Sequence, residues 1–183
     1  SFGRFVRAIR LAGAFDAALA VSPLNAKVRH SRARALIACG DYAAGWREYE
    51  ARFELPGRGR KKRAFAARPW LGDEPLAGRI ILMHCEEDVA ETLQFARYAP
   101  IAAAQGARVT LMVQPELVDL LSGFENVEVV ASGGATRAAD FQCPLASLPI
   151  AFGTDVSSVP APAPHVKAEE RRSASQVRDL TQR

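Results

Sequence analysis

The stretch IILMHCEEDVAE, residues 80–91, decides the fold of this chain of 183 residues. Its first four residues form a continuous apolar run, which is typical of a strand covered on both faces of a sheet. An acidic turn follows, and the pattern is then helical from about Val89 to Ala104, with Pro100 expected to bend or interrupt the helix. A buried strand that leads through a turn into a helix predicts a βαβ unit, and therefore an α/β fold with a parallel sheet.

The residues that follow continue this alternation. The predicted elements are a strand over 108–113, a helix over 116–121 that Pro115 can begin, a strand over 127–130, and a fourth element over 141–148. The spacing from Ile80 to Val109 suits one right-handed crossover connection. We therefore expect a Rossmann-like α/β domain over residues 79–156.

Residues 1–57 have a helical pattern instead. A helix is predicted from about Ala26 to Cys39 and a second from Tyr42 to Phe53, joined by Gly40 and Asp41. Glycine suits the left-handed position that ends a helix, and aspartate can cap the next one. Two helices with so short a connection form an antiparallel hairpin, and the segment has the length of one repeat of a 34-residue array.

Charge is concentrated in the segment between these two parts, which we assign as a basic connector over residues 58–78. Six cations and no acid lie between residues 58 and 68, and they exceed the net charge of +4 of the whole chain. They are Arg58, Arg60, Lys61, Lys62, Arg63 and Arg68. A solvated strap between domains is the preferred interpretation. Nucleic-acid binding is the alternative, but Phe65 is the one aromatic residue in the run, so we expect no nucleic-acid partner.

Several other classes of protein are disfavoured by composition. The three cysteines and three histidines have no metal-ligand spacing, so no metal site and no disulfide framework are expected. No apolar run approaches the ~20 residues of a membrane span, and no apolar leader is visible, so we expect a cytoplasmic protein. The tail, residues 157–183, is proline-rich and then charged, and it has too few apolar residues to build a core.

Several motifs carry a resemblance to a known family. GDYAAGWREYEARF (40–53) resembles the last repeat of bacterial tetratricopeptide proteins fused to a glycosyltransferase-like domain, although Gly45 stands where that repeat has alanine. WLGDEPLAG (70–78), TLQFARY (92–98) and QCPLASLP (142–149) resemble later segments of the same family. The strand ending in His84-Cys85-Glu86 also matches. The order of these motifs is more distinctive than any one of them.

The resemblance implies a truncated GT-B-type, heptosyltransferase-like protein that retains the acceptor-side half. In that family a glycine-rich turn follows the first strand, with glycine at positions 88 and 90 and aspartate at 91; this chain has Asp88, Ala90 and Glu91. The resemblance implies Glu91 as a general base and His84, Glu86, Asp88 and Gln94 as substrate-binding residues. A nucleotide-sugar donor is implied for a complete enzyme alone, with a sugar or glycan as acceptor, and we expect no other cofactor and little activity from this chain.

Each of these residues also has a structural interpretation. Carboxylates over 86–91 suit the start of a helix, where the macrodipole favours negative charge. His84 can be a buried residue with satisfied hydrogen bonds, and Gln94 can have a structural role. The alternative function is therefore a non-catalytic interaction module, in which the helical hairpins dock a protein or peptide on a degenerate Rossmann scaffold.

Overall fold

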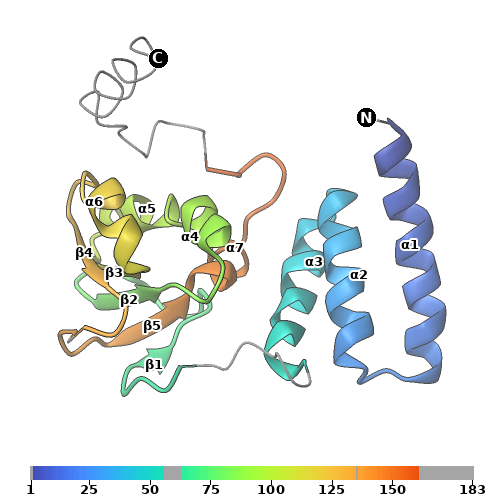
Figure 1. The fold of residues 1–183 in the computed structure, drawn as a ribbon, viewed down its shortest axis with the longest axis horizontal. Helices are drawn as coiled ribbons and strands as arrows, with labels where there is room; N and C mark the ends of the chain where they lie inside the picture. Colours follow the sequence, from blue (N-terminus) through green and yellow to red (C-terminus); the bar gives the residue numbers. More distant parts are fainter. Residues whose placement is uncertain (1, 56–62, 135, 161–183) are drawn as a thin grey trace, which may run out of the picture.

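The computed structural model describes residues 2–55, 63–134 and 136–160 (Figure 1). Four of the connector cations, Arg58, Arg60, Lys61 and Lys62, lie outside these residues, as does the charged tail from Ala161 onward. Within the described residues, no helix is long and apolar enough to cross a membrane.

The N-terminal part is helical, as expected. It consists of α1 (Phe2–Val21), α2 (Ala26–Ala38), α3 (Tyr42–Tyr49) and the 3₁₀ helix η1 (Glu50–Glu54). Asp41 Oδ1 accepts a hydrogen bond from Ala44 N at 3.2 Å, which caps α3, and Gly40 has φ +86° at the preceding turn. The second helix of the hairpin thus begins where predicted, but its last turn tightens from α to 3₁₀ at Glu50.

Gly45 lets α2 and α3 approach closely. A Cβ atom at this position would lie 2.6 Å from Ile37 Cγ1 and 3.2 Å from the Ala33 carbonyl oxygen, both on α2. Ala33 is fully buried at the same contact. The close spacing of the two helices therefore requires glycine at position 45.

The C-terminal part is an α/β layer with a five-stranded parallel sheet. Its strands are β1 (Arg68–Pro69), β2 (Ile80–His84), β3 (Arg108–Val113), β4 (Val127–Ala131) and β5 (Phe141–Pro144), in the order β1-β5-β2-β3-β4. In the register, Ile81 of the central strand β2 lies opposite Val109 and Phe141. The predicted α/β class and parallel sheet are confirmed.

Strand β1 was not predicted. Trp70 N donates to the Gln142 carbonyl oxygen at 2.9 Å, which ties the segment to β5. Proline is tolerated there because β1 is the edge of the sheet and needs fewer backbone donors. Trp70 and Leu76 are also buried in the core, so residues 68–78, which we had assigned to the connector, belong to the α/β layer.

The helices cover the sheet on one face. They are α4 (Val89–Phe95), α5 (Tyr98–Ala104), η2 (Pro115–Leu117), α6 (Val118–Leu121), η3 (Leu145–Ser147) and α7 (Leu148–Ala151). Figure 1 shows α4, α5 and α6 on the same side of the strands. The predicted helix over 89–104 is interrupted at Ala96 and Arg97, because the ring of Pro100 conflicts with a helical carbonyl four residues earlier.

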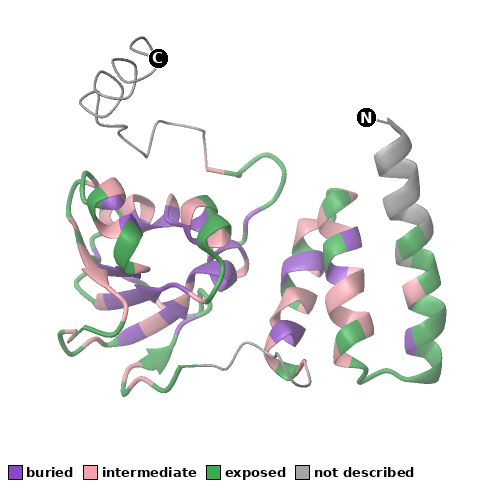
Figure 2. Cartoon of the chain, in the orientation of Figure 1, coloured by how far each residue is buried: buried purple, intermediate pink, exposed green. Residues whose placement is uncertain are grey.

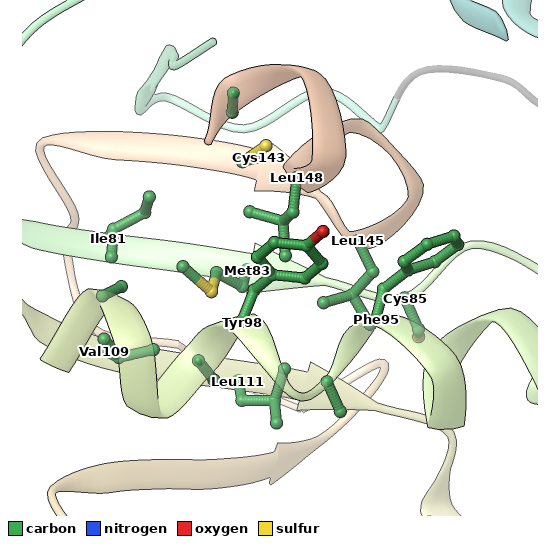
Figure 3. Packing of buried hydrophobic residues seen from close by; sticks show 14 of the residues in the cluster. Ile81, Met83, Cys85, Phe95, Tyr98, Val109, Leu111, Cys143, Leu145 and Leu148 are labelled. Atoms are coloured by element: carbon green, nitrogen blue, oxygen red, sulfur yellow. The ribbon is translucent and has the colours of Figure 1, made fainter. Parts of the chain in front are cut away.

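One hydrophobic core joins the two parts. Ile81, Met83 and Leu111 of the sheet pack against Phe95 and Tyr98 of the covering helices (Figure 3). Trp46 of α3 belongs to the same cluster, with its ring centroid 5.6 Å from that of Phe95. Figure 2 shows that burial is dense in the sheet and sparse along the described side chains of α1.

The contact at Gly45 predicts opposite effects for two glycine substitutions. Gly45→Ala should destabilise the protein by about 1–2 kcal/mol despite alanine's higher helix propensity, because the new methyl group collides with α2. Gly13→Ala in α1 meets nothing within 4 Å and should be neutral or stabilising by up to ~1 kcal/mol. Urea unfolding of both variants measures the difference, and equal effects would contradict the proposed close approach.

Candidate functional site at the strand-order switch point

The topology of the sheet marks one place for a ligand. From β2 the chain moves to β3 and β4 on one side, and β5 then inserts on the other side of β2. In open parallel sheets, ligands bind outside the carboxyl ends of the strands where the order reverses in this way. Here that crevice lies beyond His84 and Pro144, which end β2 and β5.

Arg52 of η1 occupies this crevice. Its side chain is 1% exposed. Nε lies 3.1 Å from both carboxylate oxygens of Glu86, and Nη2 donates to Glu86 Oε1 at 2.8 Å and to Ser147 Oγ at 2.7 Å. Glu86 follows β2 and Ser147 follows β5. A cation from the helical hairpin thus bridges the two strands at the switch point.

A second carboxylate completes the cluster. Arg52 Nη1 donates to Glu50 Oε1 at 2.5 Å, and Ser147 Oγ donates to the same oxygen at 2.6 Å. Burial lowers the pKa of Arg52, but the hydrogen bond and charge of Glu86, together with Glu50, outweigh burial and hold this pKa above its usual value. The guanidinium therefore stays charged inside the crevice.

The acidic turn makes a second contact with the hairpin. Tyr49 of α3 donates its hydroxyl hydrogen to Glu91 Oε1 at 2.6 Å. Asp88 caps α4, with Oδ1 accepting from Ala90 N at 2.8 Å and from Glu91 N at 3.3 Å. Asp88 has φ −88°, an ordinary value for any residue, so this turn does not need glycine at position 88.

His84 lies next to the crevice and is 2% exposed. Its Nε2 is 2.9 Å from Gln142 Oε1, and the ring centroid of Phe65 is 4.7 Å from its own. Nδ1 has no hydrogen-bond partner among the described residues. Burial lowers the pKa of His84, and the hydrogen bond with Gln142 opposes this shift in part. The ring is therefore neutral at neutral pH.

A small cavity of about 50 Å³ adjoins the cluster. Its charged and polar lining consists of Glu50, Arg63, His84, Gln142 and Ser147, and its aromatic lining of Phe53 and Trp70. This volume holds a few water molecules or one small polar group.

The predicted site residues fall into three places. His84 and Glu86 both lie at the switch point, one at the end of β2 and the other just after it, whereas Asp88 caps α4 and Glu91 contacts Tyr49. Gln94 is exposed and lines a different cavity of about 60 Å³, beside Trp46. The acidic residues therefore do not converge on one open pocket.

Sequence reasoning missed Arg52, Glu50 and Ser147. Arg52 is one of many arginines in a helical segment, and no local pattern separates it from those that pair at the surface. Arg32, for example, pairs with Glu48 and Asp16 and keeps 25% exposure of its side chain. Glu50 is two residues from Arg52, but Glu86 and Ser147 are 34 and 95 residues away along the chain, so only the fold brings them to it.

The part of the chain that the structure describes contains no group of three or more His, Cys, Asp or Glu residues suited to a metal ion. Comparison of the sequence and structure with protein-family models, curated proteins and solved structures gave no match.

The burial of His84 predicts a pH dependence of stability. Since its folded-state pKa is lowered, this contribution to stability is complete above the usual value of 6.5 and is lost as the pH falls through the folded-state pKa. His84→Gln has no titrating ring at this position. We expect it to lose less free energy of unfolding than the wild type between about pH 7.5 and pH 5.5. Urea unfolding at both pH values measures this, and equal losses in the two proteins would exclude His84 as the titrating group.

Proposed function

We propose that this chain is a non-catalytic protein-interaction module. In this proposal, tetratricopeptide-like hairpins present the docking surface, and the acceptor-side half of a GT-B-type glycosyltransferase-like domain is their scaffold. One observation supports it above others: Glu86 and Glu91, two carboxylates of the turn implied to handle a sugar, both bind hairpin side chains, Arg52 and Tyr49.

The chemistry of the turn supports the same conclusion. A general base must reach the hydroxyl hydrogen that it removes. Glu91 Oε1 already accepts a hydrogen bond from Tyr49, and the Glu86 carboxylate is engaged by Arg52. A glycine turn would bring a ligand close to the backbone, but Asp88 and Ala90 carry side chains there. The carboxylates in this arrangement serve the contact between the two parts of the chain.

An affinity-capture experiment, in which the wild type and two charge-reversal variants serve as bait, tests the interaction module. Arg34 and Arg47 are exposed on α2 and α3, whereas Arg79 and Arg108 are exposed on the α/β layer. We expect Arg34→Glu with Arg47→Glu to abolish or strongly reduce capture of the proteins that the wild type retains. The matched pair, Arg79→Glu with Arg108→Glu, should leave capture unchanged. Quantitative mass spectrometry of the retained proteins measures both, and indistinguishable profiles for the two variants would contradict docking through the hairpins.

A second candidate function is sugar transfer in a complete GT-B-type enzyme. It is favoured by a hydrogen-bonded pair, the buried His84 and the partly buried Gln142, beside a cavity at the carboxyl edge of the sheet. Glu91 would remove the proton of an acceptor hydroxyl, whose oxygen would attack the anomeric carbon of the donor sugar as a nucleoside diphosphate leaves. In the enzymes that the chain resembles, the nucleotide is held mainly by a second α/β domain, so the described residues account for the acceptor side alone.

This second function predicts turnover that the interaction module does not. With a panel of nucleotide sugars, we expect no hydrolysis or transfer above background from this chain, because the carboxylates are engaged by the hairpin. Restoring glycine by Asp88→Gly with Ala90→Gly should not create activity. Release of nucleoside diphosphate, measured by chromatography, tests both proteins. Turnover that Glu91→Gln abolishes would establish the transferase and overturn the non-catalytic proposal.

A further inference from the structure

The guanidinium group of Arg52 has partners on each of its edges. Two nitrogens face the Glu86 carboxylate, Nη2 also donates to Ser147 Oγ, and Nη1 donates to Glu50 Oε1 and, at 3.4 Å, to the Tyr49 carbonyl oxygen. The ring of Phe53 lies 4.0 Å from the central carbon. Paired carboxylate oxygens in the plane and an aromatic ring over the face are what a guanidinium prefers.

Two of the groups that contact the Arg52 guanidinium, Glu86 and Ser147, belong to the α/β layer and not to η1. Ser147 belongs to η3, which follows β5, and Glu86 lies in the turn that follows β2. The side chain of Glu86 is 8% exposed, and Ser147 is fully buried. The α/β layer thus supplies a buried carboxylate and a buried hydroxyl in fixed positions, and the hairpin supplies the cation together with Glu50 and Phe53.

The Arg52 site adjoins the small cavity described above. The cavity of about 50 Å³ is lined by Glu50, Phe53 and Ser147, all of which contact Arg52 or its partners. His84, whose Nδ1 lacks a partner among the described residues, lines the same cavity. Shortening the side chain at position 52 would join this cavity to the volume that the guanidinium now fills.

We propose that the switch-point crevice is a guanidinium-binding site that Arg52 fills from within the chain. The α/β layer recognises an arginine side chain there, through the Glu86 carboxylate and the Ser147 hydroxyl, and this recognition docks the hairpin. When the side chain of Arg52 is removed, the same site takes a free guanidinium cation. This inference does not depend on which of the two functions proposed above is correct.

Chemical rescue tests the site in the full chain. We expect Arg52→Ala to lower the melting temperature, because the buried Glu86 carboxylate loses its hydrogen bonds with the Arg52 guanidinium. Methylguanidinium at low millimolar concentration, far below denaturing levels, should raise the melting temperature of this variant in a saturable manner. At ten times the dissociation constant, the expected shift is about 3–5 °C. Sodium chloride and urea at the same concentrations should have no such effect.

Three controls separate the site from general stabilisation. The wild type should not respond, because Arg52 is present at high effective concentration. Arg32→Ala removes another paired arginine of the hairpin, one that is 25% exposed, and should not be rescued. Arg52→Ala combined with Glu86→Gln should lose the rescue, since the bidentate carboxylate is gone. A response in Arg32→Ala equal to that in Arg52→Ala, or no response in Arg52→Ala, would overturn the proposal.

A second measurement covers the case in which Arg52→Ala is unfolded at 25 °C without methylguanidinium. In that case, far-ultraviolet circular dichroism measures whether added methylguanidinium restores the folded state. Recovery of the folded signal with a saturable dependence supports the site. A signal that stays unfolded at every concentration below the denaturing range counts against it, as does equal recovery in the variant that also carries Glu86→Gln.

Discussion

The buried cation of Arg52 connects the helical hairpin to the α/β layer. Arg52 is inserted where β2 and β5 diverge, and its partners Glu86 and Ser147 stand 34 and 95 residues away in the sequence. Moving an ion out of water costs several kcal/mol, and the cost is recovered only if the partners are well placed. The 3₁₀ turn that carries Arg52, the end of the central strand and the turn after β5 must therefore be positioned as one unit.

Interactions local in sequence could be predicted, and those made by the fold could not. The apolar run at Ile80, the caps at Gly40 and Asp41, and the interruption near Pro100 all follow from residues within a few positions of each other. Strand β1 has two residues, one of them a proline, so no periodicity marks it. Its existence depends on the Trp70 hydrogen bond to β5 and on burial of the Trp70 ring. The role of Arg52 could not be predicted either, because its sequence neighbours resemble those of any charged helix and its distant partners are brought to it only by the fold.

In the candidate site, too, features set by neighbouring residues could be predicted, and contacts made only in the fold could not. His84 was correctly expected at the carboxyl end of a strand, because strand ends can be read from the apolar pattern. Asp88 stands at the start of α4, as the structural interpretation of the acidic turn predicted, and the structure adds that its side chain caps this helix. That interpretation did not anticipate that Glu86 and Glu91 point to the hairpin. The partner of a carboxylate depends on which element packs over the sheet edge, and that element is encoded more than 30 residues upstream.

The energetics of this docking argue that the hairpin is a permanent part of the α/β layer. Undocking would break the hydrogen bonds of Arg52 to Glu86 and Ser147. Hydrogen bonds to a charged group contribute about 1.5–3 kcal/mol each, whereas a whole domain is stable by about 5–15 kcal/mol. Undocking would also expose the Trp46 ring, which is 9% exposed and packs on Phe95. A sheet that bound its ligand in the switch-point crevice would have to pay both costs before each binding event. The arrangement is therefore better suited to holding a helical surface in a fixed orientation than to admitting a substrate at this edge of the sheet.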